Sequence, residues 1–194
     1  MSETIQKTLF EYEFLTLDST CSDRKIWPRF ASIRIDIQRE ARPDIQASAC
    51  FLPFRSGIFR EIYCDPPHRI GRYGQGFGLQ RSNKGLAYQR FSCWQNKEEY
   101  FKFLEAVDRE FSRTLEAGGT LHFKTTEGNL SHGTMIERKM LDRLSNFQTV
   151  REERAESMGY FARANRLKGK SASYVVFVDF LNTEGSKQGM KQKK

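Results

Sequence analysis

Residues 61–68, which read Glu-Ile-Tyr-Cys-Asp-Pro-Pro-His, decide the fold because they mark where a central strand must end. The run at 61–64 predicts a β-strand. The two prolines end it, since proline lacks the N–H group that a central sheet ladder needs. The stretch therefore predicts a strand that delivers one carboxylate, that of Asp65, to a rigid turn.

Two earlier stretches repeat this arrangement of a short strand closed by an acid. Residues 14–18 and 32–37 have strand-like patterns and carry Asp18 and Asp36 at or near their ends. In a parallel sheet, ligands bind beyond the carboxyl ends of the strands, near the switch in strand order. We therefore expect these two acids and Asp65 to meet at one edge, as a site for a small polar ligand.

The rest of the chain predicts the remaining elements. Residues 96–115 have helical apolar spacing with Asn96 as N-cap, and Gly118-Gly119 is expected to stop this helix. Local patterns predict further strands at 45–49, 120–124, 147–154 and 174–181, a helix at 134–144 and a loop at 160–170. Strands that alternate with helices or loops predict an α/β fold with a mostly parallel sheet. The last two strands, with no clear helix between them, predict an antiparallel pair at one edge.

Length and composition exclude several classes of protein. The 194 residues are 38% hydrophobic and 29% charged, which fits one domain, expected over residues 1–182, with a basic and disordered tail at 183–194. No apolar run reaches the ~18 residues of a membrane helix, and the N-terminus lacks a signal pattern, so we expect a cytoplasmic protein. Four cysteines without a C-x-x-C pair, and three histidines, predict free thiols and no metal site. Collagen, coiled coil and disulfide scaffold are also excluded.

The net charge of +8 is concentrated in one stretch of the chain. Residues 69–97 contain no acid and six basic residues, with five aromatic residues and several glycines among them. Cations bind phosphates and aromatic rings stack on bases, so this stretch favours contact with nucleic acid. The alternative is a solvated loop that happens to be basic.

The order of these motifs resembles a known family. Leu17-Asp18, Asp36, Leu52-Pro53-Phe54 and Asp65-Pro66-Pro67-His68 follow one another as in class I S-adenosylmethionine-dependent methyltransferases, and more narrowly in small phage-type and prokaryotic amino-methyltransferases with a D-P-P-H motif. The resemblance covers roughly residues 14–181. It implies a Rossmann-like sheet with helices on both faces, and S-adenosylmethionine as cofactor.

The resemblance also implies roles for individual residues. The catalytic motif, which would hold the target amine, is Asp65, Pro66, Pro67 and His68. The cofactor would contact Asp18, Thr20, Cys21, Ser22, Arg24, Asp36, Ile37, Ser48, Cys50 and Leu52. The substrate would contact a mobile loop at 69–95 and the end of a later strand, through Arg69, Arg72, Tyr73, Phe77, Arg81, Lys84, Arg90, Trp94 and Lys124.

Three positions depart from the family or have a plain alternative. Cys21-Ser22-Asp23 replaces the usual glycine-rich first loop, and Ser48 stands where an acid often binds the cofactor adenine. Lys124 either contacts substrate or is a strand-end lysine that faces solvent.

Three functions remain open at this point. The first is methyl transfer to an exocyclic amine of a DNA base, adenine or cytosine, without a metal. The second is the same chemistry on RNA. The third is a catalytically inactive nucleic-acid-binding subunit of the same fold. A chain of this length has little room for a separate target-recognition domain, so recognition would depend on the loop at 69–94, on residues 160–170, or on a second subunit in a homodimer or with a partner.

Overall fold

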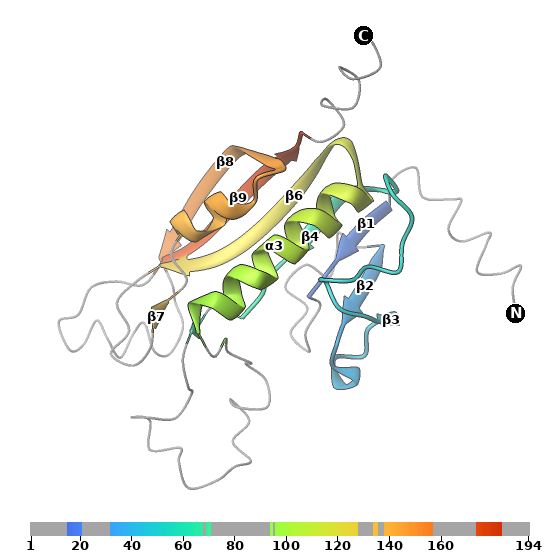
Figure 1. The fold of residues 1–194 in the computed structure, drawn as a ribbon, viewed down its shortest axis with the longest axis horizontal. Helices are drawn as coiled ribbons and strands as arrows, with labels where there is room; N and C mark the ends of the chain where they lie inside the picture. The colour runs from blue at the N-terminus through green and yellow to red at the C-terminus, as the bar shows by residue number, and fades with distance from the viewer. Residues whose placement is uncertain are drawn as a thin grey trace, which may run out of the picture.

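A seven-stranded sheet forms the centre of the computed structural model (Figure 1). The structure describes residues 15–20, 32–67, 69–70, 94, 96–127, 134–135, 138–156 and 174–183. The sheet strands, in chain order, are β1 (Leu15–Asp18), β2 (Ile33–Asp36), β3 (Ile45–Gln46), β4 (Phe59–Cys64), β6 (Leu115–Glu127), β8 (Phe147–Glu156) and β9 (Tyr174–Asn182). The helical elements are α3 (Lys97–Thr114) and the 3-10 turns η1 (Arg39–Ala41) and η2 (Arg138–Arg143), and a separate small sheet pairs β5 (Arg69–Ile70) with β7 (Thr134–Met135).

The strand order is β3-β2-β1-β4-β6-β9-β8. The first five of these strands pair in parallel, whereas β9 lies antiparallel between β6 and β8. The predicted α/β fold, mostly parallel with an antiparallel pair at one edge, is confirmed. The chain runs outward from β1 to β3 and then returns to β4, so the strand order switches between β1 and β4. Ligands of such sheets bind at this point.

Helix α3 covers one face of the sheet (Figure 1). Its N-terminus is capped as predicted, because the Asn96 side chain accepts a hydrogen bond of 2.8 Å from the Glu99 N–H. Its buried stripe has helical spacing and consists of Tyr100, Phe103, Leu104, Val107 and Phe111. Because η2 contacts both α3 and β6, these two elements cover the same face. Helices predicted on the opposite face would fall outside the described residues.

The predicted role of Gly118-Gly119 is wrong, because these glycines lie inside β6. Helix α3 ends at Thr114 and the strand begins at the next residue. Gly118 has a φ of 79°, and the pairing of β4 with β6 shifts its register between the Phe59 and Glu61 positions. A Cβ atom on Gly119 would lie 3.0 Å from the Arg60 carbonyl oxygen. The two glycines therefore form a bulge against β4, where positive φ and close approach favour residues without a side chain.

The predicted helix at 134–144 is wrong in its first part. Residues 134–135 form β7, which pairs antiparallel with β5, and the helical segment is the 3-10 turn η2 at 138–143. Its apolar residues Met140 and Leu141 are nevertheless buried. The local pattern identified the buried residues, but pairing with the strand that follows the two prolines decided the backbone.

Other sequence predictions fall on residues outside those described, namely the loop at 160–170 and most of the tail at 183–194. Among the residues that the structure describes, no helix combines the length and the apolar character needed to cross a membrane.

Candidate functional site

Three carboxylates gather at the carboxyl ends of β1, β2 and β4. Asp18 is buried, with 1% of its surface exposed. Burial raises the pKa of Asp18 to about 6, a hydrogen bond from the Thr20 N–H opposes this, and the charges of Asp65 and Asp36 raise it further. The structure thus brings Asp36 and Asp65 within electrostatic range of Asp18, at the point where the strand order switches.

The turn after β1 is fastened to the end of β4. Thr20 donates its N–H to Asp18 Oδ1 at 3.2 Å, and its hydroxyl accepts a hydrogen bond of 2.7 Å from the Asp65 N–H. Ser19 adds two hydrogen bonds of 2.9 Å, from its N–H and its hydroxyl, to the Tyr63 carbonyl. These bonds fix Asp65 relative to Asp18 because they connect the two backbones directly.

Lys124 lies against Asp65, so the alternative in which it is a strand-end lysine that faces solvent is wrong, and its contact with substrate stays a prediction. Its Nζ is 2.8 Å from Asp65 Oδ2, and the two side chains are only 14% and 8% exposed. A carboxylate buried to this extent is stable as an anion only when a cation or several donors lie beside it. Lys124 therefore supplies the positive charge that partners the Asp65 carboxylate.

The proline turn is held by Trp94. Its indole N–H donates to the Pro67 carbonyl at 2.9 Å, and its ring lies 4.8 Å from that of Phe103. Trp94 also forms a bridge with Ile70. The indole N–H of Trp94 is thus hydrogen-bonded to the D-P-P motif. Ile70 and Trp94, the residues on either side of 71–93, both lie next to this motif.

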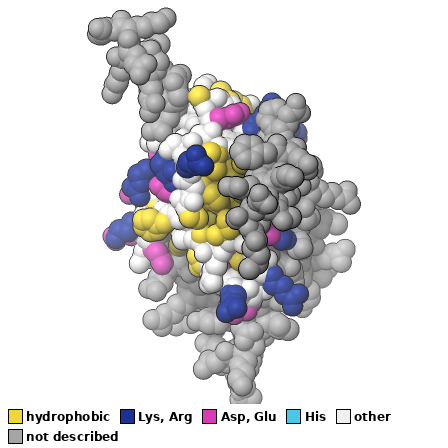
Figure 2. Space-filling model, turned by 90° about the vertical axis from the view of Figure 1, so that its right-hand side faces the viewer, with side chains coloured by type: hydrophobic (Ala, Val, Ile, Leu, Met, Phe, Trp, Pro, Cys, Tyr) yellow, Lys and Arg dark blue, Asp and Glu magenta, His cyan; other side chains and the backbone are white. Residues whose placement is uncertain are grey.

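The end of β2 and the turn after β3 present apolar side chains to the surface. Ile37 is 64% exposed and Phe51 is 75% exposed. Figure 2 faces this side of the molecule and shows apolar side chains gathered there between charged ones. Sequence analysis named Ile37 but missed Phe51, because an apolar residue beside a strand pattern reads as part of the core. Its neighbours Cys50 and Leu52 are apolar as well, so no signal in the local sequence sets Phe51 apart.

The turn after β3 has a fixed shape. Ser48 and Phe51 form a bridge, and the Ser48 hydroxyl accepts a hydrogen bond of 3.2 Å from the Cys50 N–H. Cys50 is half-buried, and burial raises the pKa of its thiol. The side chain of Leu52, which directly follows this turn, is buried in the core and so anchors the end of the turn. Asp36 accepts a hydrogen bond of 2.8 Å from the Gln38 N–H.

Several predicted site residues lie outside the described residues, or have no described side chain in the case of Arg69. These are Cys21, Ser22, Arg24, His68, Arg69, Arg72, Tyr73, Phe77, Arg81, Lys84 and Arg90.

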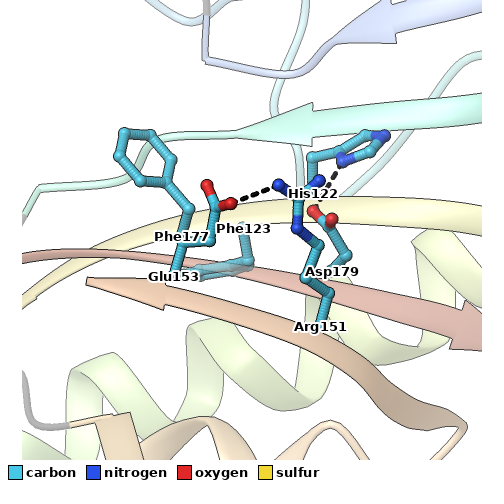
Figure 3. A pocket seen from close by; sticks show the side chains of 6 residues that line it. All are labelled: His122, Phe123, Arg151, Glu153, Phe177 and Asp179. Carbon is cyan, nitrogen blue, oxygen red and sulfur yellow. Dashed lines mark hydrogen bonds and ion pairs between the residues drawn. The ribbon is translucent and has the colours of Figure 1, made fainter. Parts of the chain in front are cut away.

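A hollow lies on the sheet face opposite α3, and none of the three acids lines it (Figure 3). His122 Nδ1 and Asp179 Oδ1 are 2.7 Å apart in it, and Arg151 pairs with Glu153. The His122 ring stacks on that of Tyr63 at 4.5 Å. Figure 3 shows charged side chains of both signs that pair with one another here. Among the described residues, no group of three His, Cys, Asp or Glu side chains could hold a metal ion.

Comparison with known proteins identifies the fold. No protein-family model matches the chain, and no curated protein matches it. Among solved structures, a protein from Methanosarcina mazei described as an S-adenosylmethionine-dependent methyltransferase matches at a TM-score of 0.50 and 14% identity, over 94% of this chain and 98% of that one. The fold is that of the class I S-adenosylmethionine-dependent methyltransferases.

Two further solved structures have the same fold. TrmN from Thermus thermophilus matches at a TM-score of 0.53 and 17% identity, over 91% of this chain and 47% of that one. The [4+2]-cyclase SpnF matches at a TM-score of 0.53 and 13% identity, over 88% and 74% of the two chains. Since a cyclase shares it, this fold alone does not determine a reaction, and the residues of the site must carry the argument.

Proposed function

We propose that the chain is an S-adenosylmethionine-dependent methyltransferase that acts on an exocyclic amine of a nucleic-acid base, with DNA as the favoured substrate. The observation that carries this proposal is the Asp65 carboxylate. Its side chain is almost fully buried at the switch in strand order and paired with Lys124, and its N–H is bound to Thr20 at the end of β1. A fixed carboxylate beside a rigid turn is suited to accept hydrogen bonds from an amino group.

The described residues fit the cofactor that the fold implies. The carboxylates of Asp18 and Asp36 suit a ligand that carries a sulfonium, an ammonium and ribose hydroxyls. The exposed side chains of Ile37 and Phe51 suit the faces of a flat base. Ser48 and Cys50 would lie at the edge of that base. When bound, the cofactor supplies an activated methyl group on a positively charged sulfur.

The catalytic contribution of the protein is alignment and electrostatic support. Asp65 and a backbone carbonyl of the proline turn would accept the two hydrogens of a planar amino group, which turns the nitrogen lone pair toward the methyl group. The nitrogen–carbon bond forms as the carbon–sulfur bond breaks, the sulfur keeps the electron pair, and the nitrogen then loses one proton to water. The Asp65 anion stabilises the positive charge that develops on the nitrogen.

Charge distribution supports a nucleic acid as the substrate. Residues 71–93 contain Arg72, Arg81, Lys84 and Arg90 and no acid. Their described neighbours, Ile70 and Trp94, bridge to each other beside the D-P-P motif. A basic segment that starts and ends at the methyl-acceptor site can bind the phosphates on either side of a target base. A base in duplex DNA must also leave the stack, which costs a few kcal/mol.

The test is transfer of radiolabelled methyl groups from S-adenosylmethionine to duplex DNA and, in parallel, to total RNA. We expect labelled DNA, with a rate at least ~10³-fold lower for Asp65→Ala while cofactor affinity changes little. Asp142→Asn is the matched control, since this carboxylate is 72% exposed. Label in RNA alone would replace DNA by RNA as the substrate. Full activity of Asp65→Ala, or no label in either polymer, would overturn the proposal and favour an inactive binding subunit.

A further inference from the structure

The chain segment after the β3 turn is fastened to the C-terminal half of α3 by one ion pair. Glu110 Oε2 accepts a hydrogen bond of 2.9 Å from the Leu52 N–H, and Arg113 Nη2 donates to the Leu52 carbonyl at 3.1 Å. Arg113 Nη1 donates to the Phe54 carbonyl at 2.7 Å. Both backbone polar groups of Leu52 are therefore bound by the same two side chains, although Leu52 and Glu110 are 58 residues apart.

The ion pair is itself well defined. Glu110 Oε2 and Arg113 Nη2 are 2.8 Å apart, with side chains that are 14% and 33% exposed. The hydrogen bond from Arg113 lowers the pKa of Glu110, so the carboxylate is ionised at neutral pH. The planar guanidinium reaches two carbonyls and a carboxylate at once, a geometry that a lysine ammonium does not reproduce.

The backbone beyond this point is bound to the same helix end. The Gly57 and Ile58 N–H groups donate to the carbonyls of Arg113 and Thr114, each at 2.9 Å. Residues 52–58 are thus held at both ends by the last turns of α3. This segment is followed directly by β4, the strand after which Asp65 comes.

The ion pair fixes a turn that presents an exposed aromatic ring. Phe51 directly precedes Leu52 and is 75% exposed, whereas Leu52 is 5% exposed. The other end of this turn is attached to β2, since the Ala47 N–H donates to the Asp36 carbonyl at 3.1 Å and the Gln46 side chain donates to the Ile37 carbonyl at 3.0 Å. The turn is therefore tied to α3 on one side and to Asp36 and Ile37 on the other. Such preformed contact surfaces raise affinity because less conformational freedom is lost on binding.

We propose that Glu110 and Arg113 are positioning residues for the adenosyl end of the cofactor. They touch no ligand themselves, but they hold the turn at 48–51 in the place where Phe51 meets the base. This inference rests on the proposed function, because it takes S-adenosylmethionine as the ligand. It adds a role for α3, a helix on which sequence analysis placed no functional residue.

The test uses Arg113→Lys, Arg113→Met and Glu110→Gln in the full chain. Glu105→Gln is the matched control, because Glu105 also pairs with an arginine, Arg143, at 3.4 Å, but does not touch the turn. The rate of hydrogen exchange at the Leu52 amide measures how strongly Glu110 and Arg113 bind this segment. We expect this rate to be roughly tenfold faster in Glu110→Gln and Arg113→Met. Thermal melting before each titration shows that the variant is folded.

Calorimetric titration with two ligands measures the positioning role. S-adenosylmethionine and 5′-methylthioadenosine share the adenosyl part, whereas only the first carries the amino acid. We expect Arg113→Met to weaken both by the same factor, about tenfold, Arg113→Lys to be intermediate and Glu105→Gln to leave both unchanged.

The outcomes separate this inference from the function on which it rests. If the wild-type chain binds S-adenosylmethionine and the folded variants bind it equally well despite faster Leu52 exchange, the ion pair is structural only and this inference alone fails. If the variants weaken S-adenosylmethionine but not 5′-methylthioadenosine, the pair acts elsewhere and the inference also fails. If the wild-type chain binds neither ligand, the proposed function fails together with it.

Discussion

The two sides of the candidate site differ in the kind of surface that they present. At the end of β4, charged groups are buried and paired with one another, as Asp65 is with Lys124. At the ends of β2 and β3, apolar groups are exposed, as Ile37 and Phe51 are. Both arrangements are the reverse of what folding alone favours, since buried charges and exposed large apolar side chains each cost stability or solubility. The comparison indicates that both sides are shaped for a ligand, one for a small polar group and the other for a flat apolar one.

The largest effect on stability is expected on the charged side. Lys124→Met leaves the buried Asp65 carboxylate without its cation, and we expect the free energy of unfolding to fall by about 3 kcal/mol in urea denaturation. The double variant Lys124→Met/Asp65→Asn removes both charges and should regain much of this loss. Lys102→Met is the control, because its pair with Glu98 is exposed and should contribute less than about 0.5 kcal/mol. Equal losses in the two lysine variants would show that Asp65 does not depend on Lys124.

An effect of opposite sign is expected at Asp18, whose pKa is raised from 3.8 to about 6. Because the folded pKa lies above the unfolded one, the protonated form favours folding, and this contribution is lost as the pH rises through about 6. Asp18→Asn cannot ionise and still accepts the Thr20 hydrogen bond. The variant should therefore gain stability relative to wild type between pH 4 and pH 7, by at most about 3 kcal/mol, while it binds S-adenosylmethionine more weakly.

Urea denaturation across this pH range, with calorimetry at pH 7, measures both effects in Asp18→Asn. Asp142→Asn, at an exposed position, is the control and should show no such trend. A stability difference that stays constant between pH 4 and pH 7 would mean that Asp18 titrates as an ordinary surface acid.

The smallest effect on stability is expected on the apolar side. Phe51→Ala removes an exposed ring, so the free energy of unfolding should change by less than about 0.5 kcal/mol. Affinity for S-adenosylmethionine should fall about tenfold, since a ring that is buried only on binding contributes only to the complex. Val150→Ala, at an exposed position of β8, is the control for both measurements. Unchanged affinity in Phe51→Ala would show that the exposed ring of Phe51 does not contact the cofactor.

The amino-acid sequence by itself determined the features that depend on neighbouring residues. Short apolar runs closed by Asp18, Asp36 and Asp65 predicted three parallel strands and the edge where their acids meet. Asn96 and the spacing after it predicted α3, and the run of valines and aromatic residues at 174–181 predicted β9. These signals are local, because proline, a capping side chain and apolar periodicity act within a few residues.

Only the tertiary structure decided the contacts between distant segments. Three such contacts join residues far apart in the sequence: Lys124 and Asp65 are separated by 59 positions, Trp94 and Pro67 by 27, and Glu110 and Leu52 by 58. The local sequence predicts that Gly118-Gly119 ends a helix, but pairing of β6 with β4 places the two glycines in a bulge. The local sequence also predicts a helix at 134–135, but these residues form a strand because they pair with β5. Strand register and ion pairing depend on which segments the sheet brings side by side, and no local pattern carries that information.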